Sequence, residues 1–597
     1  MELNSEKGAV IKYTNVPLAQ TVVQFCELKG IRNIVICAGS RNAPLTNGFV
    51  ENPFFKTFSI VDERAAAFFS LGMAQQLKAP TVVVCTSGSA LLNFYPAVAE
   101  AHYSDIPLVI ISADRMPHRI DIGDGQTIQQ KGVFEPHLAD HAYLTPDVAH
   151  ATATLLGNPN QSLIKKKPSP KEIEKRQLEI QLENELQINK VLNTAKQKSG
   201  PVHINVPMEE PLYGMTNQLI SLTYFDGGRK DSNEIDFDFF SQQWQKATKK
   251  LILVGVNFPN SIDKKKLENL LNDPSVVLMT ENTSNLRLPE AVNAIDSLIA
   301  PLENGNPNFF KTLQPEILLT FGGMVVSKKV KRFLRDFSPK SHWHVDPLKA
   351  YDTYYSLSHH IRLEPEEFIS KINTIKPFLT SDYKAKVFDQ YKAQLSIGKQ
   401  YLNKIPFSDL KAFEVIFKSL ENKWHLQLAN SSTIRYAQLF DLPESTEVFC
   451  NRGTSGIDGS TATAIGASII NQNPTLLITG DLSFFYDING LWNNYIPPNF
   501  KIILINNSGG GIFRILPGEK DTPKYDTYFE TVHRRNAKSI CKAFGLRYSS
   551  VKSLWGLRVA LKTFLKPSNK TKLLEVKTPR NLNDLVLLNY FKAMQKP

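Results

Sequence analysis

The sequence predicts an α/β protein of three doubly wound domains, each built on a parallel sheet with helices on both faces. Short runs of consecutive apolar and β-branched residues recur along the chain, with helical patterns between them. Apolar strands that alternate with helices indicate parallel sheets buried on both sides. The length of 597 residues exceeds the size at which one hydrophobic core stops growing, so several domains are expected. The composition, 42% hydrophobic and 21% charged, is typical of globular proteins.

The first domain is predicted over residues 1–215. Its strands are expected at 33–39, 58–62, 81–88, 108–114 and 202–207. A long surface helix is expected over 169–195, because Ser169 and Glu172 have the spacing of a capping box and Pro170 occupies the first helical position.

The second domain is predicted over residues 216–378, with strands at 251–256, 276–282, 317–323 and 342–346. The turn after its first strand, GVNFPNS, lacks the G-x-G-x-x-G pattern of a dinucleotide site. His342 and His344 lie on the same side of one strand and are candidate metal ligands. Because no third ligand is near them in the sequence, simple strand packing is the favoured interpretation.

The third domain is predicted over residues 379–597. A charged amphipathic helix at 381–394 leads into strands at 448–453, 475–481, 502–511 and 573–576. The order of elements is similar to that of the first domain.

Charge and composition exclude several classes of protein. The formal net charge is +12, but the basic runs at 165–167, 264–266 and 328–332 are far apart and have no interleaved aromatic residues, which argues against nucleic acid. Small anionic substrates remain compatible with this charge. The polar N-terminus and the lack of a long apolar stretch predict a cytoplasmic protein without a membrane span. Five scattered cysteines without a C-x-x-C pair argue against disulfides and zinc, and buried thiols are expected.

The stretch ITGDLSFFYDING (478–490) places Asp481 directly after a predicted buried strand. The cluster NNSGGG (506–511) follows the next strand. Because parallel sheets bind ligands beyond the carboxyl ends of their strands, the two ends are expected to face one point. A buried carboxylate needs a cationic partner.

Oxygen ligands from Asp481, from the Asn507 side chain and from the main chain near Gly509 suit Mg²⁺ (or Mn²⁺), which commonly shares its ligands with substrate phosphates. The glycines allow the backbone to approach a diphosphate, and the helix N-termini after both loops offer N–H groups. The alternative is that Gly480 and Asp481 only cap a helix and that NNSGG is only a turn.

This GD…NN arrangement resembles the thiamine-diphosphate-binding motif, with Leu482 in place of the usual glycine. In FSIVDERAAAFFSLGMA (58–74), Glu63 stands where thiamine enzymes keep their activating glutamate. A carboxyl group held against the aminopyrimidine of the cofactor shares a proton with it and so promotes removal of the thiazolium C2 proton. The alternative is that Glu63 only complements a helix dipole. The resemblance also implies at least a homodimer, because the site in these enzymes lies between subunits.

Longer motifs are more specific. They are ICAGSRNAPL (36–45), SADRMPHRIDIGDGQTIQQKGVF (112–134), NVPMEEPLYG (205–214), ANSSTIR (429–435), NRGTSGIDG (451–459) and NNSGGGIF (506–513). In this order they resemble the MenD family of 2-succinyl-5-enolpyruvyl-6-hydroxy-3-cyclohexene-1-carboxylate synthases, thiamine-diphosphate enzymes of menaquinone biosynthesis. The resemblance implies a transferase that decarboxylates 2-oxoglutarate and adds the succinyl carbanion to isochorismate. It also implies a pyrimidine-binding domain at 1–215 and a diphosphate-binding domain at 379–597.

The resemblance assigns residues to each ligand. For the cofactor these are Glu63, Ile457, Asp481, Leu482, Ser483, Asn507, Gly509, Gly510 and Ile512, with Asp481, Asn507 and Gly509 as metal ligands and Ile457 as the wedge that bends the cofactor. For the succinyl end they are Ser431, Arg435 and Arg452. For isochorismate they are Ser40, Arg41, Arg115, Gln126, Lys328 and Lys329, and for the apolar lining Ile512, Phe513 and Leu516.

Arginines suit both substrates, since both are dicarboxylates and a guanidinium group binds a carboxylate bidentately. For each arginine the alternative is a surface ion pair worth about 0–1 kcal/mol. Other functions stay open: an acetolactate-synthase-like enzyme or another 2-oxoacid decarboxylase, and a non-catalytic nucleotide-binding scaffold. The sequence offers no histidine for acid-base catalysis among these motifs. It does not decide between dimer and tetramer, between Mg²⁺ and Mn²⁺, or whether the central domain binds a regulatory ligand.

Overall fold

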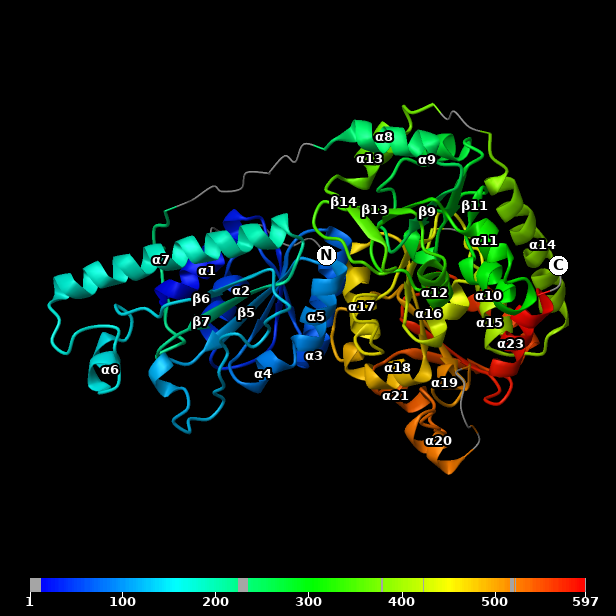
Figure 1. Ribbon diagram of the computed structural model, residues 1–597. Helices are drawn as coiled ribbons and strands as arrows, with labels where there is room; N and C mark the ends of the chain where they lie inside the picture. Colours follow the sequence, from blue (N-terminus) through cyan, green and yellow to red (C-terminus); the bar gives the residue numbers. More distant parts are fainter. Residues whose placement is uncertain are drawn as a thin grey trace. The chain divides into compact units, whose positions relative to one another are not determined.

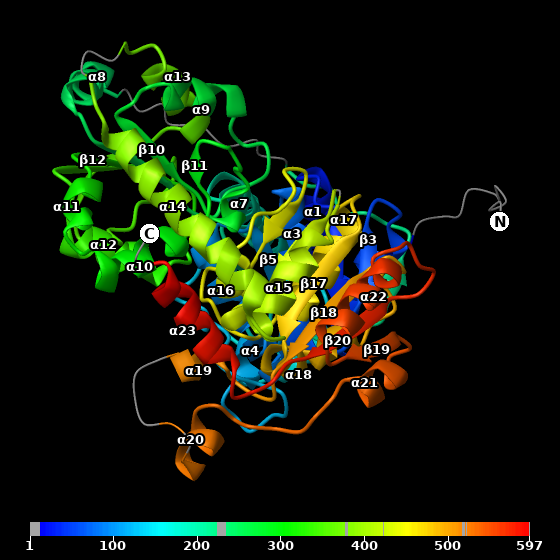
Figure 2. The ribbon, with the colours of Figure 1, turned by 90° about the vertical axis from the view of Figure 1, so that its right-hand side faces the viewer.

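The computed structural model describes residues 12–223, 235–376, 380–421, 423–515, 520 and 522–595. The chain divides into two compact units (Figures 1 and 2). Unit 1 comprises Met1–Lys230, Thr461–Asn471 and Asp487–Ile496, and unit 2 comprises Asp231–Ser460, Gln472–Tyr486 and Pro497–Pro597. Two short stretches from the C-terminal third of the sequence therefore belong to unit 1.

Unit 1 is built on a six-stranded parallel sheet. In spatial order its strands are β3 (Lys56–Ser59), β2 (Asn33–Ile36), β4 (Thr81–Cys85), β5 (Leu108–Asp114), β7 (Val202–Pro207) and β6 (Asp140–Tyr143). A two-stranded antiparallel ladder joins β1 (Tyr13–Thr14) to β8 (Met215–Thr216). Every residue of β4, β5 and β7 is buried, as expected for strands that are covered on both faces.

The helices of unit 1 cover this sheet. They are α1 (Pro17–Leu28), α2 (Ala43–Glu51), α3 (Glu63–Leu77), α4 (Ser89–Leu92), α5 (Tyr95–Ser104), η1 (Pro117–Arg119), α6 (Thr152–Gly157), α7 (Pro170–Gln197), α17 (Ser460–Ile470, in unit 1 from Thr461 on) and η3 (Ile488–Leu491). The long helix α7 lies beside α1 (Figure 1) and begins with the predicted capping box of Ser169 and Glu172. That prediction is confirmed.

Unit 2 contains two further six-stranded parallel sheets. The central sheet has the order β11 (Ala291–Val292), β10 (Val276–Met279), β9 (Lys250–Val254), β12 (Ile317–Phe321), β13 (Ser341–Val345) and β14 (Leu357–Ile361). The third has the order β16 (Glu447–Phe449), β15 (His425–Leu428), β17 (Thr475–Gly480), β18 (Lys501–Asn506), β20 (Lys572–Lys577) and β19 (Arg547–Val551). Figure 2 shows β17, β18 and β20 side by side.

The helices of unit 2 flank both sheets. Those that precede β15 are α8 (Phe237–Lys246), α9 (Lys264–Leu271), η2 (Asn282–Ser284), α10 (Ile295–Gly305), α11 (Phe309–Leu313), α12 (Lys328–Asp336), α13 (Pro365–Ile372), α14 (Tyr383–Lys404) and α15 (Asp409–Lys418). Those that follow it are α16 (Ser432–Ala437), α18 (Asp481–Tyr486), α19 (Ile512–Ile515), α20 (Pro523–Tyr528), α21 (Lys538–Ala543), α22 (Leu554–Phe564) and α23 (Asn583–Ala593).

The predicted fold class is confirmed, since the described residues form three parallel six-stranded sheets with flanking helices. If the strands of each sheet are numbered in chain order, the first and third sheets both read 2-1-3-4-6-5, which confirms the predicted similarity between their domains. The central sheet reads 3-2-1-4-5-6, the order of dinucleotide-binding folds, although the glycine pattern is missing. One sheet lies in each predicted domain range, and the domain boundaries themselves stay predictions.

Several strands differ from the sequence-based expectation. β3 ends at Ser59, before most of the predicted stretch 58–62, because Asp62 serves as the N-cap of α3. Of the strands in the three large sheets, β6, β11, β14, β15 and β19 were not predicted. β6, β14 and β19 are edge strands with polar, half-exposed residues, and β11 has only two residues. β15 is central and buried, but His425 and Gln427 interrupt the apolar run by which such a strand is recognised.

His342 and His344 behave as packing residues rather than as metal ligands. Both rings lie 2.8 Å from the hydroxyl of Thr320 on the neighbouring strand β12. Burial lowers the pKa of both, that of His342 to about 4. Within the described ranges no group of three or more His, Cys, Asp or Glu side chains is arranged to hold a metal. All five cysteines are buried thiols, as predicted.

Among the residues that the structure describes, no helix is both long enough and apolar enough to cross a membrane.

Helix α17 packs against α3 in direct backbone contact. A Cβ atom added at Gly466 would lie 1.9 Å from the carbonyl oxygen of Phe69. One added at Gly72 would lie 2.1 Å from that of Thr463. Only glycine at these positions permits this approach, which anchors α17 in unit 1.

We expect Gly466→Ala to lower the free energy of unfolding by about 1–3 kcal/mol, because the added methyl group overpacks a rigid backbone contact. Calorimetric thermal unfolding measures this change. Gly157→Ala in α6 is the matched control, since no atom lies within 4 Å of the added carbon. Equal midpoints for the two variants would contradict the packing argument.

Candidate active site

Two strand-end loops meet at the carboxyl edge of the third sheet. β17 and β18 are paired with Gly480 opposite Ile505, so Asp481 and the asparagine cluster follow at adjacent positions. The backbone N–H of Gly509 donates to Asp481 Oδ2 over 3.0 Å, and the N–H of Leu482 donates to Oδ1 over 2.7 Å. The structure thus brings together the two segments that the sequence singled out.

A cavity of about 190 Å³ lies at this point. It is at the topological switch of the sheet, between β15 and β17, where ligands bind in open α/β folds. Its lining includes Ser431, Ile457, Asp481, Leu482, Ser483, Asn507, Gly509, Gly510, Ile512 and Phe513. The predicted cofactor residues other than Glu63 therefore surround one space. Leu516 lies outside the described residues.

Two buried carboxylates share this cavity. Asp481 and Asp409 are each 2% exposed, and both line the space. Burial, together with the nearby charge of Asp481, raises the pKa of Asp409 to about 6. Among the described residues no lysine or arginine forms an ion pair with either carboxylate. Carboxylate and amide oxygens without a cationic partner fit a divalent cation.

His533 lies against the same carboxylate. Its Nε2 is 3.3 Å from Asp481 Oδ2, while its Nδ1 accepts the backbone N–H of Arg535 over 3.1 Å. Because Nδ1 is an acceptor, the ring proton is on Nε2 and faces Asp481. Nε2 makes no hydrogen bond with the described residues, so His533 is a close neighbour of Asp481 rather than a hydrogen-bonded partner.

Residues 525–533 pack against the loop that contains Ser508, Gly509 and Gly510 and hold its backbone. The N–H of Gly510 donates to the Glu530 carbonyl over 2.6 Å, and the N–H of His533 donates to the Ser508 carbonyl over 3.1 Å. A Cβ atom at Gly509 would lie 2.7 Å from the Glu530 carbonyl oxygen, so this approach requires glycine.

The Glu530 side chain anchors this segment. It is 1% exposed and accepts from Arg514 Nε over 2.9 Å and from Arg580 Nη2 over 2.7 Å. Burial alone would raise the pKa of Glu530, but hydrogen bonds from Arg580 and Arg514 hold it below its ordinary value. The charge cluster therefore fixes the backbone on which Gly509 and Gly510 rest.

Apolar side chains face the cavity beside these polar groups. Ile457 and Phe513 are 37% and 36% exposed, although both are large apolar residues. The hydroxyl of Ser483 donates to the Ile457 carbonyl over 2.6 Å and so fixes that residue in place. An apolar ligand surface would cover them.

A group of cations lies near the same sheet edge. Arg435 Nη1 donates to the Ser431 carbonyl and Arg452 Nη1 donates to Asn430 Oδ1, each over 2.7 Å. Burial and then the charge of Arg452 lower the pKa of Arg435. Ser431 itself has a φ of 68°, which is unfavourable for a serine and marks local strain.

Helix α12 contributes lysines with different surroundings. Lys328 is exposed, and Lys329 forms an ion pair with Glu303. Lys331 is closer to the arginines: burial and then the charge of Arg452 lower its pKa. Sequence reasoning noted it only as part of a basic run, and no local pattern distinguishes it from its neighbours.

In unit 1, Glu63 is the first residue of α3. The side chain of Asp62 caps this helix and accepts the Ala65 N–H over 2.8 Å. Asp62 also accepts Asn489 Nδ2 over 2.7 Å, so η3 supports the turn that presents Glu63. The charge of Glu63 contributes, after burial, to the raised pKa of Cys37 at the end of β2.

The predicted isochorismate residues of unit 1 also gather at strand ends. Arg41 Nη2 lies 2.8 Å from Glu210 Oε1, and Arg115 Nη1 lies 3.9 Å from the same oxygen. Gln126 has a φ of 56°, and its carbonyl accepts the Ser87 hydroxyl over 2.8 Å. Ser40 is exposed after β2. Glu210, which sequence reasoning quoted only within a motif, is the shared anion of the two arginines.

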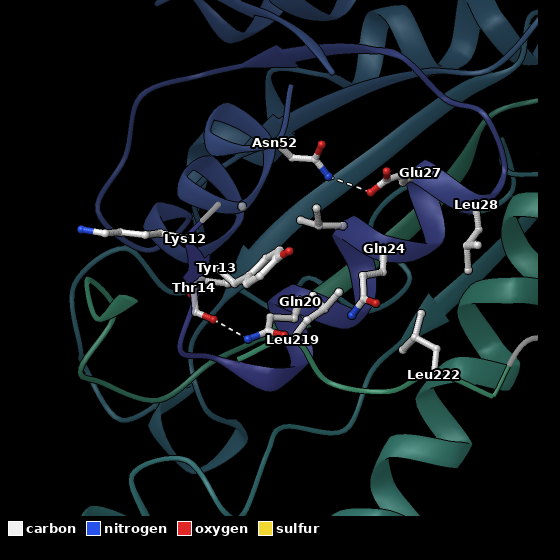
Figure 3. A pocket seen from close by; sticks show the side chains of 12 residues that line it. Lys12, Tyr13, Thr14, Gln20, Gln24, Glu27, Leu28, Asn52, Leu219 and Leu222 are labelled. Atoms are coloured by element: carbon white, nitrogen blue, oxygen red, sulfur yellow. Dashed lines mark hydrogen bonds between the residues drawn. The ribbon is translucent and has the colours of Figure 1, made fainter. Parts of the chain in front are cut away.

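A larger hollow of about 510 Å³ in unit 1 has no comparable chemistry (Figure 3). Its charged lining residues are Lys12 and Glu27, and Glu27 accepts Asn52 Nδ2 over 2.7 Å. Gln20 and Gln24 donate to the backbone carbonyls of Thr14 and Ile220. These polar groups bind one another rather than point into the hollow.

Comparison with known proteins identifies two domains and several full-length relatives. Residues 17–142 match the thiamine pyrophosphate enzyme N-terminal TPP binding domain, and residues 430–576 match the C-terminal TPP binding domain. A 2-succinyl-5-enolpyruvyl-6-hydroxy-3-cyclohexene-1-carboxylate synthase of Flavobacterium johnsoniae is 49% identical over 98% of this chain and 100% of its own length. Proteins of the same name from Christiangramia forsetii and Bacteroides fragilis are 48% and 35% identical, over 98% and 96% of this chain and 100% and 98% of their own lengths.

We expect Glu530→Gln to lower the free energy of unfolding by about 3–5 kcal/mol, because the buried Arg514 loses its closest carboxylate and the half-buried Arg580 keeps only Asp526. Thermal unfolding of the purified protein measures the change. Glu444→Gln is the control, since Glu444 forms an exposed pair with Lys264 of a kind worth about 0–1 kcal/mol. If both variants unfold at the wild-type temperature, the charge cluster does not anchor the loop.

Proposed function

Because the chain belongs to the family of 2-succinyl-5-enolpyruvyl-6-hydroxy-3-cyclohexene-1-carboxylate synthases, we propose that it decarboxylates 2-oxoglutarate and transfers the succinyl unit to isochorismate in menaquinone biosynthesis. The protein is an enzyme of the transferase class, and the two domain matches confirm thiamine diphosphate as its cofactor. Enzymes of this type use a divalent metal such as Mg²⁺ together with the cofactor.

One observation carries the proposal for the site. The Gly509 N–H donates to Asp481 Oδ2 over 3.0 Å, so the two predicted metal-binding loops are in direct contact at one cavity. We infer that Asp481, the Asn507 side chain and the Gly509 carbonyl hold the metal. Ser483, Leu482 and Gly510 would then border the diphosphate, with Ile457 and Ile512 against the apolar part of the cofactor.

The bound cofactor supplies an electron sink for the carbon that loses CO₂. The protein's own groups bind, orient and exclude water. Glu63 holds a proton for exchange with the cofactor's aminopyrimidine, and Asp62 and Asn489 fix the turn that presents it. Ile457 and Phe513 keep water from the reacting centre, which strengthens the electrostatic interactions there.

The cations beside the cavity favour dicarboxylate substrates. We assign Ser431, Arg435 and Arg452 to the distal carboxylate of 2-oxoglutarate, because two partly buried guanidinium groups with like charge need an anion between them. Arg41, Arg115, Gln126, Ser40, Lys328 and Lys329 are assigned to isochorismate.

We further propose that the enzyme acts in the cytoplasm and is at least a homodimer. Support for the dimer comes from the resemblance to thiamine enzymes, in which the site lies between subunits. Support for the compartment comes from the biosynthetic reaction proposed above.

An acetolactate-synthase-like activity is the second candidate function. Its substrates are small 2-oxoacids without a second carboxylate, so its pocket has no need of Arg435 and Arg452. The charge of Arg452 lowers the pKa of Arg435, so the two guanidinium groups lie close together, which favours a substrate with a second carboxylate.

We expect the enzyme with thiamine diphosphate and Mg²⁺ to release CO₂ from 2-oxoglutarate and not from pyruvate, because only 2-oxoglutarate offers a second, distal carboxylate to Arg435 and Arg452. Labelled CO₂ release measures both reactions, and added isochorismate should yield the coupled product. Turnover of pyruvate alone would contradict the substrate assignment.

We expect Glu63→Gln to lower turnover by about 10²–10⁴-fold while the cofactor still binds, because the amide cannot exchange a proton with the aminopyrimidine. Steady-state kinetics measure turnover, and calorimetry measures cofactor binding. Glu27→Gln, at the distant hollow of unit 1, is the control and should turn over like the wild type. Unchanged turnover in Glu63→Gln would refute its role in proton transfer.

A further inference from the structure

Asp409 is a buried acid whose position is not explained by its own helix. It is the first residue of α15 and is 2% exposed. An acid in a first turn usually complements the helix dipole from the surface. Here the capping is done by Ser408, whose side chain accepts the Lys411 N–H. The carboxylate of Asp409 instead points to two other elements of the third sheet.

These two contacts fix the carboxylate. Asn507 Nδ2 donates to Asp409 Oδ2 over 2.8 Å, and the Thr578 hydroxyl donates to Asp409 Oδ1 over 2.5 Å. The Asp409 backbone N–H in turn donates to Asn583 Oδ1 over 2.8 Å. Thr578 and Asn583, which follow β20, therefore fix the position of Asp409. Asp409 in turn fixes the side-chain amide of Asn507.

The contact determines which atom of the Asn507 amide faces the cavity. An ionised carboxylate only accepts hydrogen bonds, so the amide nitrogen must face Asp409. The amide oxygen then lies on the opposite branch of the same planar group. Among the described residues no hydrogen bond to Asn507 Oδ1 is found, although Asn507 lines the cavity.

The neighbouring asparagine provides an internal comparison. Asn506 Nδ2 donates to Glu575 Oε1 over 2.6 Å and to the Arg535 carbonyl over 3.0 Å. Its Oδ1 accepts the Ser508 N–H over 3.1 Å. Asn506 thus has partners on both sides of its amide, as in a structural role. Asn507 is held on its nitrogen side alone, which leaves its oxygen for a ligand.

We propose that Asp409 is a positioning residue for the divalent metal: it holds the Asn507 amide so that Oδ1 is presented to the ion beside Asp481. This inference rests on the proposed function, since it takes Asn507 as a metal ligand. Partners behind a ligand commonly fix its orientation in this way, and their loss weakens metal binding about 10–100-fold.

The test measures Mn²⁺ binding in the presence of thiamine diphosphate, with free Mn²⁺ detected by electron paramagnetic resonance. We expect Asp409→Ala to weaken Mn²⁺ binding about 10–100-fold, because the amide is free to rotate. Asp409→Asn should retain most of the affinity, since its Oδ1 still accepts from Asn507 and its Nδ2 can donate to the Thr578 hydroxyl.

Glu575→Ala is the matched control. It removes an equally buried carboxylate that holds Asn506 instead of Asn507. We expect it to lower the thermal unfolding midpoint and to leave Mn²⁺ affinity close to that of the wild type. Asp409→Ala should show the converse: a clear loss of Mn²⁺ affinity with little change in the unfolding of the metal-free protein, because a buried like charge is removed together with its hydrogen bonds.

Thr578→Val tests the same role of Asp409 if Asp409→Ala does not fold. It removes one hydrogen bond to Asp409 and leaves Asn507 unchanged, so a smaller loss of Mn²⁺ affinity is expected. Wild-type affinity in the folded variants of both positions would overturn the inference. So would an Asp409→Asn variant as weak as Asp409→Ala, which would assign the role to charge rather than to amide orientation.

Failure of the proposed function gives a different pattern. The wild-type enzyme could bind Mn²⁺ with thiamine diphosphate and yet not decarboxylate 2-oxoglutarate. In that case the substrate assignment fails, while the Mn²⁺ affinities of the variants still decide the inference about Asp409. If the wild-type enzyme binds no Mn²⁺, both are overturned.

Discussion

The register between β17 and β18 is the constraint on which the site depends. With Gly480 paired to Ile505, the residues that follow both strands must leave the sheet at the same edge. The Gly509 N–H then links the two loops by donating a hydrogen bond to Asp481 Oδ2. A slip of one residue would turn every side chain of a strand to the opposite face, so the buried apolar residues of both strands protect this register. The geometry of the site is thus a consequence of core packing.

Charge is separated around the cavity in a way that suits an anchored cofactor and an anionic substrate. The carboxylates of Asp409 and Asp481 line the cavity. The charge of Arg452 lowers the pKa values of both Arg435 and Lys331, so these three cations form a second group. The first group attracts a cation and the second attracts carboxylates. Because the carboxylates are buried and the cations are half-buried, each interaction is stronger than it would be at the surface. A metal with its diphosphate and a dicarboxylate can therefore bind side by side.

Much of this arrangement could be predicted from sequence, because local patterns carry it. Apolar runs identified most of the central strands, and polar residues directly after two of them identified Asp481 and Asn507. The buried central strand β15 was missed, because polar and apolar residues alternate in HLQL. Edge strands such as β14 escaped notice because their residues are polar and half-exposed. Asp409 and His533 escaped notice for another reason: their close neighbours Asn507 and Asp481 are far away in the sequence, and SDLK and TVHR are ordinary stretches by themselves. The support of Glu63 by Asn489 is equally remote.

Three buried acids of unit 2 differ in whether a cationic side chain lies beside them. Glu530 is paired with two arginines, and Glu575 accepts from Tyr548 and Asn506 and has Lys577 at 3.8 Å. Asp409 accepts from an amide and a hydroxyl, and among the described residues it has no cation of its own. Since a buried carboxylate without a cation is costly, a divalent cation held by Asp481 would also offset the cost of burying Asp409.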